Sequence, residues 1–338
     1  MKMVKQVPLP QDSQDAMPLS TPRRLRILTL TTCTLLAAAA CGGPGQGTEN
    51  PSTPQGPAPS TQKAQQTSPR PQAQPQEVIG GGQEIFAHRY VALYGNPSGP
   101  SLGALGEQSP EESVTRVKDL ASQYQGYSQE KVIPAFEIIA TVASSAPGVD
   151  GDYSDEASLE SLRPLVDLAA KEGIYVILDF QPGYSSFTEQ VKDYEELLKE
   201  PHVGIGIDAE WRIYPGQVHL QQIGSVDASE INETLDYLAE LTQQNHLPQK
   251  MVVLHQFTLS MIAHRSQLES KHPELALTLH ADGHGSPELK EATYQQLLAG
   301  LNPEIKPSWK NFYDEDTPML SPAETYALEP KPFVVTYQ

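Results

Sequence analysis

Two carboxylates, an indole and a guanidinium follow one another where a short apolar run ends. Residues 203–211 are rich in β-branched residues and glycine, and they close on Asp208, Glu210 and Trp211, with Arg212 next. Residues two apart on a strand point to the same face, so Asp208 and Glu210 are expected side by side. Such a pair can perform acid–base chemistry when one group is protonated and the other ionised. The alternative is a loop entry in which the acids pair with Arg212.

Other polar side chains stand at the ends of further strand-like runs. Parallel strands bring their carboxyl ends to one edge or mouth, so these side chains are expected to line a common cleft. Carboxylates and amides bind hydroxyl groups and aromatic rings stack on sugar faces, which suits a polyhydroxylated ligand. The residues expected there are Tyr94, Glu137, Asp179, Gln181, Asp208, Glu210, Trp211, His255, Gln256, His280, Asp282, Tyr313, Asp314 and Gln338.

Eight strand-like runs alternate with amphipathic segments from residue 85 onward. This order and length predict an α/β fold, a (β/α)₈ TIM-like barrel whose last strand pairs with the first and lacks a final helix. The alternative is an open, doubly wound parallel sheet. No Gly-x-Gly-x-x-Gly turn follows the first run, which disfavours dinucleotide binding. The predicted strands are 89–94, 131–141, 174–179, 203–211, 250–256, 275–280, 308–313 and 333–337, and the predicted helices are 110–124, 157–172, 187–199, 228–244, 259–270, 288–298 and 322–328.

Glycoside hydrolysis needs one protonated and one ionised carboxyl group, and the sequence offers candidates for both. Glu210 is the predicted general acid, and Asp208 and Asp179 are predicted to assist it or to activate water. The predicted substrate-binding residues are Tyr94, Glu137, Gln181, Trp211, Arg212, His255, Gln256, Asp282 and Tyr313.

The segment Gly204-Ile-Gly-Ile-Asp208-Ala-Glu210 resembles the fourth-strand Asp-x-Glu ending of glycoside hydrolase families 18 and 25. That resemblance implies that Glu210 is the general acid and that Asp208 assists it. The chitinase-like pattern carries two further aspartates, where this chain has Val203 and Gly206, and the final strand lacks the expected tryptophan. As a whole, the chain resembles bacterial lipoproteins that carry a barrel domain.

Several alternative roles remain open. Glu137 could be a buried structural acid bound across the barrel, and Asp179 could cap the next turn. His255, His280, Asp282 and His284 could together bind a divalent metal with Asp208 or Glu210. The sequence contains neither a His-Glu-x-x-His motif nor a close cysteine pair, so no metal ligand and no cofactor is assigned. It also lacks the Gly-x-Ser-x-Gly elbow of a serine hydrolase.

The first 84 residues have a different composition from the rest. Basic residues precede an apolar run ending in small residues and Cys41, which is typical of an export signal over 1–40. The run resembles a lipobox, which implies a diacylglyceryl Cys41 that anchors the protein to the outside of the cell membrane. Residues 41–84 are predicted to be a Pro-, Gln-, Ser- and Thr-rich tether, and 85–338 to be the barrel domain. With one cysteine after the signal, no disulfide framework is possible.

The chain of 338 residues carries a formal charge of −19, which disfavours a nucleic-acid partner. These features predict a membrane-anchored glycosidase outside the cytoplasm that acts on an envelope or extracellular glycan. Two alternatives are a non-catalytic lipoprotein that binds glycans or organises the envelope, and a metal-dependent hydrolase or isomerase.

Overall fold

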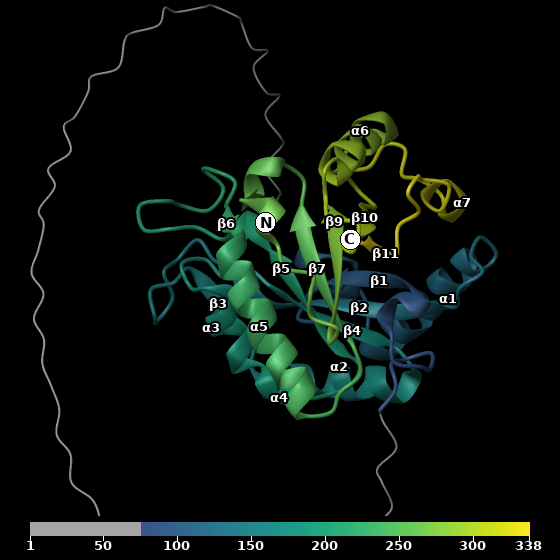
Figure 1. Cartoon of the computed structure of the whole chain (residues 1–338), viewed down its shortest axis with the longest axis horizontal. Coiled ribbons are helices and arrows are strands. Elements are labelled where there is room, and N and C mark those ends of the chain that lie inside the picture. Colours follow the sequence, from purple (N-terminus) through teal and green to yellow (C-terminus); the bar gives the residue numbers. More distant parts are fainter. Residues whose placement is uncertain (1–75) are drawn as a thin grey trace, which may run out of the picture. The chain divides into compact units, whose positions relative to one another are not determined.

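Eight parallel strands close into a barrel, as the sequence predicts (Figure 1). The computed structural model describes residues 76–338, so the expected signal, Cys41 and most of the tether lie outside the described residues. The last strand pairs with the first, Tyr90 opposite Val334, and within residues 76–338 no helix follows it. The barrel strands are β1 (Arg89–Gly95), β2 (Val132–Ala143), β4 (Tyr175–Phe180), β5 (Val203–Asp208), β7 (Lys250–Gln256), β9 (Leu275–Ala281), β10 (Lys306–Asn311) and β11 (Val334–Tyr337).

Helices cover the outside of the barrel, with α2 and α5 against the strands in Figure 1. Several begin with a serine cap, and Ser109 and Glu112 form a reciprocal capping box at the start of α1. None of the helices of residues 76–338 is long and apolar enough to span a bilayer. The helices are α1 (Pro110–Gln125), α2 (Leu159–Glu172), α3 (Phe187–Asp193), α4 (Glu195–Leu198), α5 (Ala228–Gln244), α6 (Pro287–Leu298) and α7 (Pro322–Thr325).

The predicted helix over 259–270 is wrong. Two short 3₁₀ turns, Leu259–Met261 and Arg265–Gln267, flank the two-residue strand β8 (Ile262–Ala263). This strand pairs with β6 (Val226–Asp227). Its backbone groups therefore form hydrogen bonds with another loop instead of the hydrogen bonds of a helix. The sequence also gave no sign of β3 (Ser154–Glu156), which adds antiparallel to the end of β2.

The barrel interior is apolar near the amino ends of the strands, which we call the lower half, and polar near their carboxyl ends, which we call the upper half. Tyr90 and Tyr175 fill the lower half, with their rings 5.4 Å apart in an edge-to-face arrangement. Val78 and Ile85, just before β1, are buried in the same cluster. The carboxyl ends of the strands, which we call the mouth, instead carry the buried polar side chains described below.

Lys250 is a buried cation far from the mouth, at the first position of β7. Its Nζ donates to the carbonyl oxygens of Glu200 and Val203, at 2.9 and 2.7 Å. Burial lowers the pKa of Lys250 to about 7, and Glu200 opposes this shift. A neutral amine still has two hydrogens, one for each carbonyl. The folded protein therefore holds Lys250 less protonated than the unfolded chain does between pH 7 and about 10.

We predict that wild type gains stability relative to Lys250→Met as the pH rises from neutral toward 10. The unfolded chain binds more protons at this lysine across that window. Raising the pH therefore increases the free energy of unfolding of wild type by up to about 1.4 kcal/mol per pH unit relative to the variant. Urea unfolding of both proteins at several pH values measures the difference in free energy of unfolding. A difference that stays constant over the window would contradict this assignment.

Candidate active site

The register of the barrel strands brings polar side chains to one level of the mouth. Tyr94 on β1 lies opposite Glu137 on β2, and Asp208 on β5 lies opposite His255 on β7. His255 in turn lies opposite His280 on β9. Neighbouring strands therefore present these groups into the same space, as expected from their positions near strand ends.

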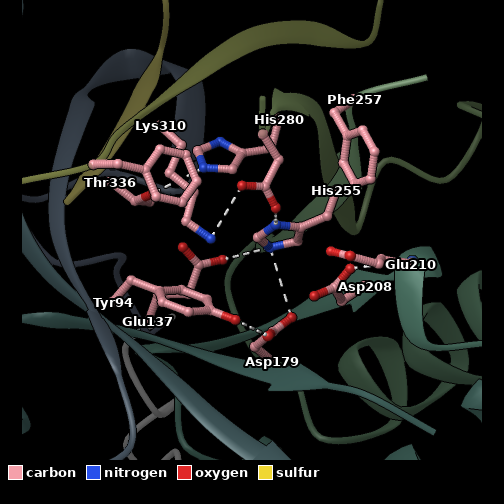
Figure 2. Close-up of polar contacts among 12 residues, drawn as sticks. Tyr94, Glu137, Asp179, Asp208, Glu210, His255, Phe257, His280, Lys310 and Thr336 are labelled. Carbon is pink, nitrogen blue, oxygen red and sulfur yellow. Dashed lines mark hydrogen bonds and ion pairs between the residues drawn. The ribbon is translucent and has the colours of Figure 1, made fainter. Parts of the chain in front are cut away.

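His255 lies at the centre of the site, fully buried between carboxylates (Figure 2). Its Nε2 is 2.9 Å from Glu137 Oε1 and 3.6 Å from Asp179 Oδ1. Its Nδ1 is 2.8 Å from Asp282 Oδ2. Burial lowers the pKa of His255, but the facing carboxylates Glu137 and Asp179 outweigh it and raise the pKa well above its usual value.

Asp282 connects His255 to Lys310, a buried lysine on β10. Lys310 Nζ is 3.1 Å from Asp282 Oδ1 and 3.6 Å from the centre of the Tyr94 ring. Burial disfavours the ionised form of Asp282, but Lys310 and His255 outweigh it and hold its pKa well below the usual range. Both oxygens of Asp282 thus face a cationic or hydrogen-bonding partner, which fixes the orientation of His255.

Two buried carboxylate oxygens point into this site without a hydrogen-bond partner among the described residues. They are Glu137 Oε2 and Asp179 Oδ1, on side chains with no exposed surface. The other Asp179 oxygen accepts a 2.9 Å hydrogen bond from the Tyr94 hydroxyl. Burial raises the pKa of Asp179 to about 6, and Glu137 adds to this while His255 opposes it.

Gly206 keeps space open beside one of these oxygens. It lies opposite Asp179 in the β4–β5 register, and a Cβ at residue 206 would be 2.7 Å from Asp179 Oδ1. That separation is shorter than van der Waals contact, so any side chain here would displace the carboxylate. Residue 206 must therefore be glycine if the Asp179 carboxylate is to keep its position.

The expected strand pairing of Asp208 and Glu210 is wrong. β5 ends at Asp208, and Glu210 lies in the 3₁₀ turn Ala209–Trp211. Asp208 Oδ1 accepts a 3.2 Å hydrogen bond from the Glu210 backbone N–H and so caps that turn. Glu210 is half-buried at the edge of the site, beside Asp208 in Figure 2. Burial raises the pKa of Glu210 to about 7, with Asp282 adding to the shift.

Glu137, Asp179 and His255 together match a site for a divalent cation. One ligand atom from each lies within 4.8 Å of the others, and all three side chains are buried. Asp208, His255 and Asp282 form a second such group. The first group fits better, because it holds the two unpartnered oxygens, whereas both oxygens of Asp282 are already bonded. One imidazole and two carboxylates suit first-row divalent metals.

The structure brings only part of the predicted set to this centre. Tyr94, Glu137, Asp179, Asp208, Glu210, His255, His280 and Asp282 gather there, and Gln181 donates to the Tyr94 hydroxyl at 3.3 Å. The other predicted residues lie away from the centre of the site. Arg212 pairs with Glu230, Gln256 bonds the Thr258 backbone and Arg265, Trp211 packs on His219, Tyr313 lies by Arg116, His284 packs on Phe312, Asp314 is exposed, and Gln338 bonds the Asn311 and Tyr313 backbones.

Lys310 is the functional residue that sequence reasoning missed. It lies within β10, with its side chain 3% exposed. A charged residue within a predicted barrel strand is a signal that could have identified it, because such a lysine must be buried or face outward into a helix. Glu137 is predicted as a site residue and shares this feature.

Comparison with known proteins gives a distant likeness. No known family model matches the chain, and no curated protein matches it. Two of the solved structures that match are of oxaloacetate acetylhydrolase, one with the inhibitor 3,3-difluorooxalacetate and one with the product oxalate. The first has a TM-score of 0.43 and 12% identity over 75% of this chain and 76% of that chain. The second has a TM-score of 0.40 and 12% identity over 74% and 75%.

The prediction of a glycoside hydrolase is wrong. The site gives the physical reason, because the Asp-x-Glu pair on which that prediction rested is not a strand pair. Asp208 caps a turn, and the buried carboxylates surround an imidazole.

Two aspartates of the site should respond oppositely to neutralisation in the metal-free protein. Asp179→Asn removes a charge with an unpartnered buried oxygen, so it should stabilise the fold by roughly 1–3 kcal/mol. Asp282→Asn breaks a buried charge pair with Lys310 and should destabilise it by about 3–5 kcal/mol. Thermal unfolding in a chelator at mildly alkaline pH measures both. Equal destabilisation by the two substitutions would show that Asp179 is as well compensated as Asp282.

Proposed function

We propose that this protein is a divalent-metal-dependent hydrolase or isomerase. The observation that carries the proposal is that two buried carboxylates, Glu137 and Asp179, face His255 Nε2 and that each keeps one oxygen without a hydrogen-bond partner. Burying carboxylates that are not fully paired is costly, and a cation bound to both would reduce that cost. The cation would polarise a substrate oxygen or lower the pKa of a bound water.

The residues around the centre have separable roles in this proposal. Glu137, Asp179 and His255 hold the cation. Asp282 accepts the hydrogen of His255 Nδ1, which leaves Nε2 as the metal-binding nitrogen, and Lys310 keeps Asp282 ionised. These two are positioning residues, because they act through His255.

Glu210 is the proposed general acid and base. It is more exposed than the other acids of the site, and burial together with Asp282 raises its pKa to about 7. A carboxyl group with this pKa can both take and return a proton near neutral pH. Asp208 holds the backbone of Glu210 in place through the 3₁₀ turn, so we assign Asp208 a positioning role.

Metal binding provides the direct test. Purified wild type should bind about one divalent ion per chain at this centre, and Glu137→Gln should reduce its affinity at least tenfold through the loss of a ligand charge. Calorimetric titration with Mn²⁺, Mg²⁺ and Zn²⁺ measures this. Asp150→Asn is the matched control, because Asp150 belongs to a separate, more exposed acidic group with Asp152 and Glu156. Loss of binding in Asp150→Asn with retention in Glu137→Gln would overturn the proposal.

Turnover separates catalysis from binding at the same site. On any ester, amide or sugar-isomer substrate that a screen reveals, Glu210→Gln should lower the rate about 10²–10⁴-fold, because the proton transfer is lost. Its metal affinity should stay unchanged. Full activity in Glu210→Gln would remove its acid–base role.

We further propose that the protein is anchored outside the cytoplasm through a diacylglyceryl group on Cys41. The support is the sequence alone: small residues before Cys41 follow a basic and apolar segment. Fractionation of cells producing wild type and Cys41→Ser should place the wild type with membranes and release a large share of the variant. Equal membrane retention of both proteins would argue against lipid attachment at this residue.

A further inference from the structure

Exposed large apolar side chains concentrate at the mouth end of the barrel. Nine such residues occur in the part of the chain that the structure describes. Eight of them follow the carboxyl ends of strands, and Tyr127, between α1 and β2, is at the opposite end. The eight are Val149, Tyr214, Val218, Leu220, Ile223, Leu259, Leu289 and Tyr313.

Half of this set belongs to one loop between β5 and β6. We call residues 213–225 the rim loop, which projects beside β6 in Figure 1. It contains no Asp, Glu, Lys or Arg, although the chain carries a charge of −19. Leu220 is 46% exposed and has φ +66°, a backbone conformation that favours glycine or asparagine. An exposed leucine held in this conformation points to a surface role for its side chain.

The rim loop is fixed to neighbouring loops of the mouth. Its His219 Nε2 is 3.1 Å from the Tyr153 carbonyl oxygen, and the Tyr184 hydroxyl donates to the Gln217 carbonyl oxygen at 2.9 Å. The His219 ring also packs on Trp211, directly after Glu210. The loop therefore contacts residues next to the site. Its apolar side chains are exposed to solvent although hydrogen bonds hold its backbone in place.

We propose that the rim loop is a docking surface for the lipid bilayer. An uncharged loop with separate aliphatic and tyrosine side chains fits the interfacial region of a membrane, where aromatic rings and short apolar side chains insert. Asp150 and Asp152 lie close to Val149 in sequence, so the surface favours neutral over anionic lipids. Docking would aim the mouth at a molecule that resides in the membrane.

The lipid anchor proposed at Cys41 would place a bilayer within reach of the barrel. The 35 residues from Cys41 to the described part can span at most about 115 Å. This segment joins the barrel at the end opposite the mouth, near Val78 and Ile85. Barrel strands of seven residues are about 23 Å long, so the tether is long enough to pass the barrel and let the rim face the membrane.

The test uses the full chain reconstituted into phosphatidylcholine vesicles whose acyl chains carry bromine. An environment-sensitive dye is attached to a cysteine introduced by Val218→Cys or, as the control at the opposite end, by Tyr127→Cys. The chain without an added cysteine gives the background from Cys33 and Cys41. We expect a blue shift and bromine quenching at residue 218 and neither at residue 127.

Further variants distinguish the outcomes. Leu220→Asp combined with Ile223→Asp should abolish quenching at 218, and phosphatidylglycerol in the vesicles should weaken it. No quenching at either site, or equal quenching at both, would overturn the proposal. A blue shift without vesicles that grows with protein concentration would show that a second copy covers the rim, which also overturns it. The substrate part of the proposal rests on the proposed function, but metal titration needs no vesicles, so the two can fail separately.

Discussion

An excess of buried negative charge at the mouth is the constraint on which the rest of the structure depends. Four carboxyl groups, those of Glu137, Asp179, Asp208 and Asp282, share this space with Lys310 and two imidazoles, His255 and His280, and burial lowers the pKa of His280. Burying unpaired charge costs several kcal/mol, so each acid must be bonded, protonated or matched by a cation. Asp282 is matched by Lys310, whereas burial raises the pKa of Asp179 and Asp208.

The fold tolerates this concentration of charge because the barrel below it is rigid and apolar. The rings of Tyr90 and Tyr175 and the aliphatic side chains around them fill the lower interior, and strand register fixes the level of the polar groups that the strands carry above them. Gly206 shows how closely the backbone is adapted to the site, because even a methyl group there would contact Asp179 Oδ1. Burial of these apolar side chains therefore helps to offset the cost of burying the charged groups at the mouth.

The sequence predicts the barrel well because its signals are local and repeated. Apolar runs mark the strands, and their spacing fixes the closure of the last strand on the first. The helix expected at 259–270 failed for the opposite reason. Leu259, Met261 and Ile262 have helix-like spacing, but β8 pairs with β6, a contact between loops far apart in sequence that periodicity cannot show.

The sequence predicts where the buried polar cluster lies, but not how Asp208 and Glu210 are arranged in it. Ends of parallel strands identified Asp179, His255 and Asp282 as members. The assignment of Asp208 and Glu210 as one strand-borne pair needed the last residue of β5 to be known within two positions, which sequence patterns do not give. Lys310 was missed because inward and outward positions of a buried strand look alike when both faces are covered.

One hydrogen position connects the electrostatics of the site to the proposed chemistry. As the side chains stand, His255 faces carboxylates through both ring nitrogens, which favours the doubly protonated imidazole. Asp282 is held by Lys310 as well, so its bond to Nδ1 is the firmer of the two. The hydrogen between Nε2 and Glu137 is then the one that a divalent cation would replace, at the point where Glu137 Oε1 and Asp179 Oδ1 both face Nε2. The same charge excess that makes this region costly for the protein alone thus makes it suited to a cation.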